Sequence, residues 1–147
     1  MRFFFCFISK LYNRDFNLWV ENTKDSIKSN NFAAIDWESL VEEIDDMGKS
    51  EKRSLESYLE RLIEHILKLQ YWNAEYNNNY RHWRAEVINF RNRLKRIIKR
   101  SPSLNNFMSE VYPEIFQDAV DAKKSEFDIP DSCFIPLEKI LDKDYFG

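Results

Sequence analysis

The sequence predicts an all-α fold, an antiparallel up-and-down helical bundle of four to five helices with an irregular C-terminal tail. Glycine is scarce among the 147 residues, with only two, and proline occurs four times, so long uninterrupted elements are expected. Apolar residues also recur at three- and four-residue spacing along several segments, which is the period of one helical face. Residues 11–147 are long enough to surround one core, and we predict a single domain there.

The first two helices are expected between residues 13 and 47. One begins near Asn13, as its N-cap, and runs to about Ser29. Asp36 is expected to cap a second, short helix through Met47, and Gly48 then suits the left-handed position that ends many helices. The positions expected to face inward are Phe16, Trp19, Val20, Thr23 and Ile27 in the first helix, and Trp37, Leu40, Val41 and Ile44 in the second.

The strongest helical pattern lies between residues 50 and 100. Ser50 is expected to open a third helix, and a loop rich in asparagine and tyrosine is predicted from Tyr71 to Tyr80 before a fourth. Each helix carries a heptad seam with steps of four and three residues, and two matched seams in succession predict antiparallel partners. The seams are Leu55, Leu59, Leu62, Ile66 and Leu69, broadened by Tyr58, Ile63 and Leu67, and then Trp83, Val87, Phe90, Leu94 and Ile97.

The remaining third of the chain predicts one more long helix and a tail. Ser101-Pro102-Ser103 is expected to end the fourth helix and start the fifth, since proline is tolerated in a first turn. Pro113 lies inside the fifth apolar stripe and predicts a kink or a split. After Phe127, two further prolines predict an irregular tail with one or two helical turns at 137–141. The fifth stripe is Leu104, Met108, Val111, Ile115, Ala119 and Ala122.

Charge is distributed unevenly along the chain. Residues 36–47 contain six acidic residues and no basic one, whereas residues 81–100 contain eight basic residues and only Glu86 as an acid. A basic helix is typical of proteins that bind nucleic acid or anionic membranes. The two alternatives, which we favour, are that the segments lie near each other in the folded chain or that both are solvated faces.

The N-terminal apolar run and the two cysteines bear on the compartment of the protein and on its cofactors. The apolar run from Phe3 to Ile8 is shorter than the apolar region of a signal peptide, so residues 1–10 are interpreted as an apolar leader that need not be ordered. No stretch is long enough to span a membrane. Cys6 and Cys133 have neither disulfide-framework nor zinc spacing. We therefore expect a cytoplasmic protein without a cofactor or a bound metal.

Seven short phrases are more distinctive than helix patterns alone. They are Leu11–Phe16 with Trp19, Ile35–Leu40 with Glu42–Ile44, Met47–Glu51, His65–Tyr71, Trp83–Arg84, Ser101–Leu104, and Ile140–Phe146. Through them, residues 11–147 resemble a bacterial, largely cyanobacterial family catalogued as domain of unknown function 29. The resemblance implies a soluble all-helical bundle with no established activity, so it carries over no catalytic residue. Two departures are Asn13, where the family more often has an acidic cap, and Pro113, which interrupts a usually continuous helix.

His65 is the residue with the clearest catalytic alternative. Glu64 precedes it and Arg61 lies one turn back, which fits an acid–base pair or the arginine–histidine dyad of HEPN-type helical endoribonucleases. Such dyads usually have four to six residues between the two, and here there are three. We therefore favour a histidine at the core boundary whose ring packs on the seam.

Two other groupings have a functional and a structural interpretation. Glu56, Glu60 and Glu64 share a helical face, but a di-iron bundle needs Glu-x-x-His pairs that neither histidine supplies, so surface ion pairs with Arg53, Arg61 and Lys68 are expected. Aromatic residues between Tyr71 and Trp83, beside Arg81 and Arg84, could stack on bases. Covering one end of the bundle is the interpretation we favour for them.

The sequence therefore predicts a non-enzymatic protein-interaction or self-association module. The absence of a catalytic signature, the charge segregation and an aromatic content of 16% lead to this prediction. The partner expected is another protein or a second copy, with no membrane involved. The alternative is an RNA-acting protein, either a metal-independent endoribonuclease using His65, Arg61 and Glu64 or a nucleic-acid binder using Arg84, Arg91, Lys95 and Arg96.

Overall fold

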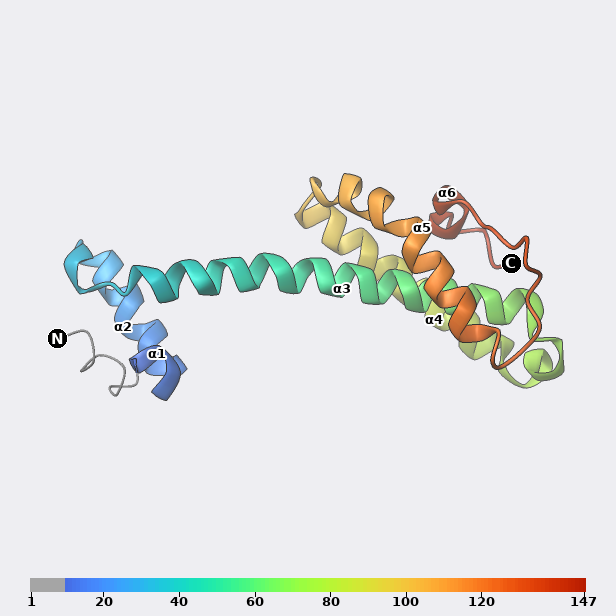
Figure 1. The fold of residues 1–147 in the computed structure, drawn as a ribbon, viewed down its shortest axis with the longest axis horizontal. Helices are drawn as coiled ribbons and strands as arrows, with labels where there is room; N and C mark the ends of the chain where they lie inside the picture. The colour runs from blue at the N-terminus through green and yellow to red at the C-terminus, as the bar shows by residue number, and fades with distance from the viewer. Residues whose placement is uncertain (1–9) are drawn as a thin grey trace. The chain divides into compact units, whose positions relative to one another are not determined.

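The computed structural model describes residues 10–147, and all its regular elements are helices (Figure 1). They are α1 (Leu11–Arg14), α2 (Phe16–Lys28), the 3₁₀ turn η1 (Phe32–Ala34), α3 (Trp37–Tyr71), α4 (Asn73–Arg100), α5 (Leu104–Lys123) and α6 (Leu137–Leu141). The predicted all-α class is confirmed. The chain divides into two compact units, one ending at Gly48 and one starting at Lys49. The single domain at 11–147 stays a prediction, and the leader prediction falls, except for Lys10, outside the described residues.

Helix α3 is one continuous element of 35 residues, where the sequence predicts two. The predicted helix end at Gly48 and the predicted start at Ser50 are wrong. Gly48 lies within the helix and does not have a positive φ. One glycine costs a helix only about 1 kcal/mol, and the residues around it, Met47 and Lys49 among them, are good helix formers. The helix therefore continues through it.

In the first unit, the N-cap of α2 is Asp15 and not Asn13. The Asp15 carboxylate accepts a hydrogen bond from the Leu18 backbone N–H at 3.0 Å, and Asn13 lies inside α1. A carboxylate is the better cap because it also interacts favourably with the positive end of the helix dipole. The core of this unit is small. Trp19, Thr23, Ile35 and Ser39 are buried, whereas Phe16, Val20 and Ile27, which are predicted to face inward, are exposed.

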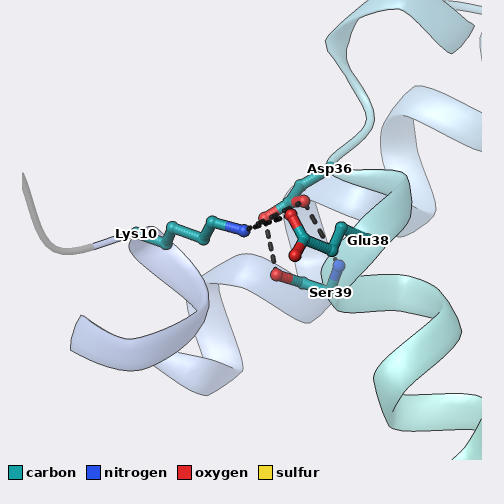
Figure 2. A network of polar contacts seen from close by, with 4 residues as sticks. All are labelled: Lys10, Asp36, Glu38 and Ser39. Atoms are coloured by element: carbon teal, nitrogen blue, oxygen red, sulfur yellow. Dashed lines mark hydrogen bonds and ion pairs between the residues drawn. The ribbon is translucent and has the colours of Figure 1, made fainter. Parts of the chain in front are cut away.

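The start of α3 is held by the network drawn in Figure 2. Asp36 accepts hydrogen bonds from the Ser39 backbone N–H at 3.2 Å and from the Ser39 hydroxyl at 2.6 Å, which confirms Asp36 as the cap. Lys10 donates to Glu38 at 3.0 Å. These bonds tie the start of α1 to the first turn of α3 and fix which edge of α3 faces α1.

The second unit is a bundle made by the second half of α3 with α4 and α5. Ser101 at the end of α4 donates to Glu51 near the start of this half at 3.0 Å, and Arg93 donates to Tyr58 at 3.1 Å, so α4 runs antiparallel to α3. Both predicted seams are confirmed, because every member is buried except Tyr58 and Ile97, which are half-buried. The seams form one core with Leu104, Met108, Tyr112, Phe116, Ala119 and Val120 of α5 and Ile129, Ile135 and Ile140 of the tail.

The predicted loop at 71–80 and the predicted split at Pro113 are both absent from the second unit. Residues 71–80 do not form a loop, because α4 begins at Asn73 and only Trp72 separates it from α3. Contacts one helical turn apart, from Asn79 to the Glu75 carbonyl and between the Tyr76 and Tyr80 rings, support the helix there. Pro113 does not split α5, since buried residues on both sides of it hold the helix against the core, and the alternative of a kink stays a prediction.

The tail follows the surface of the bundle and is anchored to it. Turn α6 lies at the predicted position, with Ile140 fully buried. The Tyr112 hydroxyl donates to the Ile135 carbonyl, and Arg91 donates to the carbonyls of Ile140 and Tyr145. Among residues 10–147, no helix has both the length and the apolar content needed to cross a membrane.

Candidate interaction surface

The first half of α3 exposes a row of large apolar side chains, which we call the α3 face. It consists of Trp37, Val41, Ile44 and Met47, with exposed fractions of 51%, 64%, 59% and 61%. The spacing of four, three and three residues places them on one side of the helix. Phe32, itself exposed, extends this surface, because its backbone carbonyl accepts a hydrogen bond from the Trp37 indole and the two rings lie 6.4 Å apart.

The α3 face has the spacing of a helix stripe that is built to be covered. Val41, Gly48, Leu55, Leu62 and Leu69 follow one another at seven-residue intervals. At about 100° per residue, Trp37 and Ile44 fall within the same arc of the helix as Leu59 and Ile66. In the second unit this stripe is buried under α4 and α5, and in the first unit the corresponding residues are exposed.

The prediction that Trp37, Val41 and Ile44 face inward is therefore wrong. In the first unit, α1 contacts α3 through a different edge, since Lys10 binds Glu38 and approaches Asp36, and Tyr12 donates to Glu43 at 2.9 Å. Ser39 between them is buried. The edge of α3 that is covered is therefore the polar one, and the apolar one is left in solvent.

Carboxylates surround the α3 face. Glu42 and Asp46 are exposed and, within residues 10–147, accept no hydrogen bond and form no ion pair. The hydrogen bond to Glu43 raises the pKa of Tyr12 to about 12, so this phenol stays a neutral donor at physiological pH. The hydrogen bond from Ser39 lowers the pKa of Asp36, and the hydrogen bond to Glu38 raises the pKa of Lys10. The surface is therefore apolar in its middle and anionic around it.

His65 lies at the boundary of the core in the second unit. Its Nδ1 is 2.7 Å from the carbonyl oxygen of Arg61, and its ring centroid is 5.5 Å from that of Phe90. Because a carbonyl can only accept, Nδ1 carries the proton. Burial lowers the pKa of His65, with Lys68 acting in the same direction and the Arg61 carbonyl, Glu86 and Glu64 opposing it. The neutral ring is therefore the stable form in the folded chain.

This lowered pKa makes stability depend on pH. The unfolded chain binds a proton on His65 near the ordinary pKa of 6.5, while the folded chain does so only at lower pH, so the contribution of the neutral ring is present above 6.5 and lost as pH falls through the lowered pKa. We expect the urea midpoint to fall between pH 7 and pH 5 more steeply for the unmodified chain than for His65→Gln. Equal slopes would contradict this assignment.

The other catalytic candidates, Arg61 and Glu64, and the nucleic-acid candidate Arg84 do not meet around His65. Arg61 is exposed and lies along a groove between α3 and α4, whereas Glu64 pairs with Lys123 of α5 at 3.7 Å. Arg84 lies over the Phe146 ring at 3.8 Å from its centroid, which is a cation–π contact with the tail. Arg61, Glu64 and Arg84 therefore have three different surroundings, none of which is the His65 ring.

The four nucleic-acid candidates of α4 also differ in their exposure and in their contacts. Arg91 is only 8% exposed, and its guanidinium donates to Ile140 at 2.7 Å and to Tyr145 at 2.6 Å. Arg84 is engaged with Phe146, and Lys95 and Arg96 are exposed. Two of the four cations thus hold the C-terminal tail, and two face solvent.

The groove beside Arg61 is a positively charged feature that the sequence analysis missed. Its volume is about 610 Å³, and it contains three arginines, Arg53, Arg61 and Arg93, with Glu86 as its only acid. Arg93 also donates to Asn89 at 3.3 Å. The signal in the sequence was the eight-residue interval between Arg53 and Arg61, which is about two helical turns and places both on one side of α3. Residues 86, 89 and 93 have a similar spacing on α4 and line the other side of the groove.

The predicted ion pairs along α3 do not form. Within residues 10–147, Arg53, Arg61 and Lys68 form no ion pair. Glu56 and Glu60 line a groove together with Arg53 and with Glu114 and Asp118 of α5. Burial raises the pKa of Glu60, and Glu64 and Asp118 raise it further, while Arg61 and Lys123 act in the opposite direction. No three metal-binding side chains in this part of the chain are placed to hold an ion together.

These features define an all-α bundle protein with an exposed apolar helix face bordered by acids. The chain belongs to the family described as domain of unknown function DUF29, whose model matches residues 11–146. Searches among curated proteins and among solved structures find no significant match.

Proposed function

We propose that this protein is a non-enzymatic interaction module that binds a protein partner through the α3 face. The observation that carries the proposal is the exposure of Trp37, Val41, Ile44 and Met47 on a stripe whose continuation is fully buried. Contiguous exposed apolar side chains with a polar border are typical of protein-binding sites. A side chain such as Val41, 64% exposed in the free chain, has most of its surface available for burial in a complex.

The arrangement of the candidate catalytic residues supports binding over catalysis. The only nitrogen of His65 that could accept a proton is Nε2, and neither Arg61 nor Glu64 is hydrogen-bonded to the ring through its side chain. A general acid or base needs a partner or a substrate position within hydrogen-bonding distance. The α3 face, in contrast, is already arranged as a continuous surface.

Paired aspartate variants test this function. Ile44→Asp places a charge in the α3 face, and Ile88→Asp places the same charge at an exposed site on α4, where the side chain is 49% exposed. We expect proteins captured from cell extract by the full-length chain, identified by mass spectrometry, to be lost with Ile44→Asp and kept with Ile88→Asp.

Three results would contradict the proposal. Equal capture by both variants would show that the α3 face takes no part in the interaction. A full-length chain that captures no protein and sediments as a monomer would show that there is no interaction. Captured material that ribonuclease releases would support the RNA-acting alternative instead.

A further inference from the structure

We propose that the occupant of the α3 face is an amphipathic helix of another protein, with lysine or arginine residues bordering its apolar stripe. This inference rests on the proposed function and names the chemistry of the partner. Three properties of the described residues lead to it. They are the shape of the α3 face, its charge, and the charges that border the other exposed apolar residues of the chain.

The shape of the α3 face indicates a helix. The same stripe in the second unit is covered by helices, and side chains spaced by four and three residues form ridges that interlock with those of another helix. Trp37 to Met47 spans about 15 Å at 1.5 Å per residue, or about three turns. A helix of about 12 residues is therefore long enough to cover it.

The charge of the α3 face indicates a basic partner. Glu38, Glu42 and Asp45 follow one another at four and three residues, so they form a row along one border of the face. Glu38 is held by Lys10, but its side chain is still 85% exposed, and Glu42 has no ion-pair partner within residues 10–147. A lysine or arginine at the border of a docked helix would lie opposite this row, as at the flanking positions of a coiled coil.

A second copy of this chain fits the face less well. Two α3 faces packed together would bring two acidic segments together, and like charges at that distance repel. Exposed apolar residues elsewhere are scattered, as with Tyr76, Ile88 and Phe134, or lie on α2 among balanced charges. Those of α2 are Phe16, Leu18, Val20 and Ile27, with Glu21 and Asp25 against Lys24 and Lys28. Helix α4 is basic, but its apolar seam is buried in the core, so the described residues offer no exposed apolar stripe bordered by basic residues.

The probe for this inference is a designed helical peptide of about three heptads with leucine at the core positions and lysine at the flanking positions. The control peptide has glutamate at every flanking position. Fluorescence anisotropy with the full-length chain is expected to show binding of the lysine peptide at least about tenfold tighter than binding of the glutamate peptide. Added salt should weaken the lysine peptide's binding.

Variants of the full-length chain locate this binding. Ile44→Asp is expected to weaken it at least about tenfold, and Ile88→Asp to leave it unchanged. Both sites are about half exposed or more, so both variants should fold, which circular dichroism checks. Glu38→Lys combined with Glu42→Lys is expected to reverse the preference toward the glutamate peptide.

The outcomes separate this inference from the proposed function. Equal affinity for the two peptides, still lost with Ile44→Asp, would overturn the basic partner and leave the α3 face as an interaction surface. A dimer in sedimentation that Ile44→Asp dissociates would make a second copy of the chain the occupant of the α3 face. Lysine-peptide binding that appears only when Phe3, Phe5 and Phe7 are changed to serine would make the first ten residues the occupant. Either result would overturn the helix of another protein and leave the α3 face as an interaction surface. Peptide binding that Ile44→Asp does not change would overturn the inference and count against the proposed function. The same holds if neither peptide binds.

Discussion

Leu62→Ala is expected to destabilise the chain by about 2–5 kcal/mol, whereas Ile44→Ala should cost less than about 1 kcal/mol. Both residues lie on the apolar stripe of α3, but Leu62 is completely buried and Ile44 is 59% exposed. Removing buried methyl groups loses their transfer free energy and leaves a cavity, while an exposed isoleucine has little packing to lose. Urea denaturation followed by circular dichroism measures both variants.

The comparison tests the α3 face in the absence of any partner. Alanine has a higher helix propensity than isoleucine, so Ile44→Ala is expected to be close to neutral in stability when the side chain is in solvent. A loss at Ile44 as large as the loss at Leu62 would show that Ile44 is covered in the free chain. The α3 face would then not be available for binding.

Arg91→Ala is the second substitution with a large expected effect, about 2–4 kcal/mol of stability. The Arg91 guanidinium is the donor for the carbonyls of Ile140 and Tyr145, at 2.7 and 2.6 Å. Its removal leaves the Ile140 carbonyl without this donor, opens a cavity, and removes a cation 5.3 Å from the Phe146 ring. We expect the tail to detach before the bundle unfolds, seen as faster amide hydrogen exchange over 137–146.

Arg96→Ala is the matched control for this prediction. Arg96 is on the same helix and exposed, so its removal should change stability by less than about 0.5 kcal/mol. The loss of stability in Arg91→Lys should lie between the losses in Arg91→Ala and Arg96→Ala, because an ammonium keeps the charge but cannot donate in two fixed directions. Unchanged exchange of the tail in Arg91→Ala would show that the apolar anchors, Ile135 and Ile140, are sufficient.

The bundle core could be predicted from the sequence, whereas the surface of the first unit could not. The seams of Leu55 to Leu69 and Trp83 to Ile97 are regular over four turns, and only burial explains such regularity. The stripe of Trp37, Val41 and Ile44 is just as regular, but periodicity shows only that a face favours burial. It does not show whether the cover belongs to the same chain.

The errors in element boundaries have local physical causes. Gly48 and the asparagines before Tyr80 weaken a helix by about 1 kcal/mol or less each, which contacts with neighbouring turns can offset. Those contacts, such as Asn79 with Glu75, depend on side-chain conformation and do not follow from composition. The arginine groove was missed for a related reason, because it joins residues of α3 and α4 whose register only the folded bundle defines.

Exposed apolar residues on α3 also mean that folding of the free chain leaves some of its hydrophobic driving force unused. Water that surrounds Trp37 and its neighbours is released only when another molecule covers them. Assembly at this helix would therefore carry a negative heat-capacity change of its own, in addition to the one that accompanies folding.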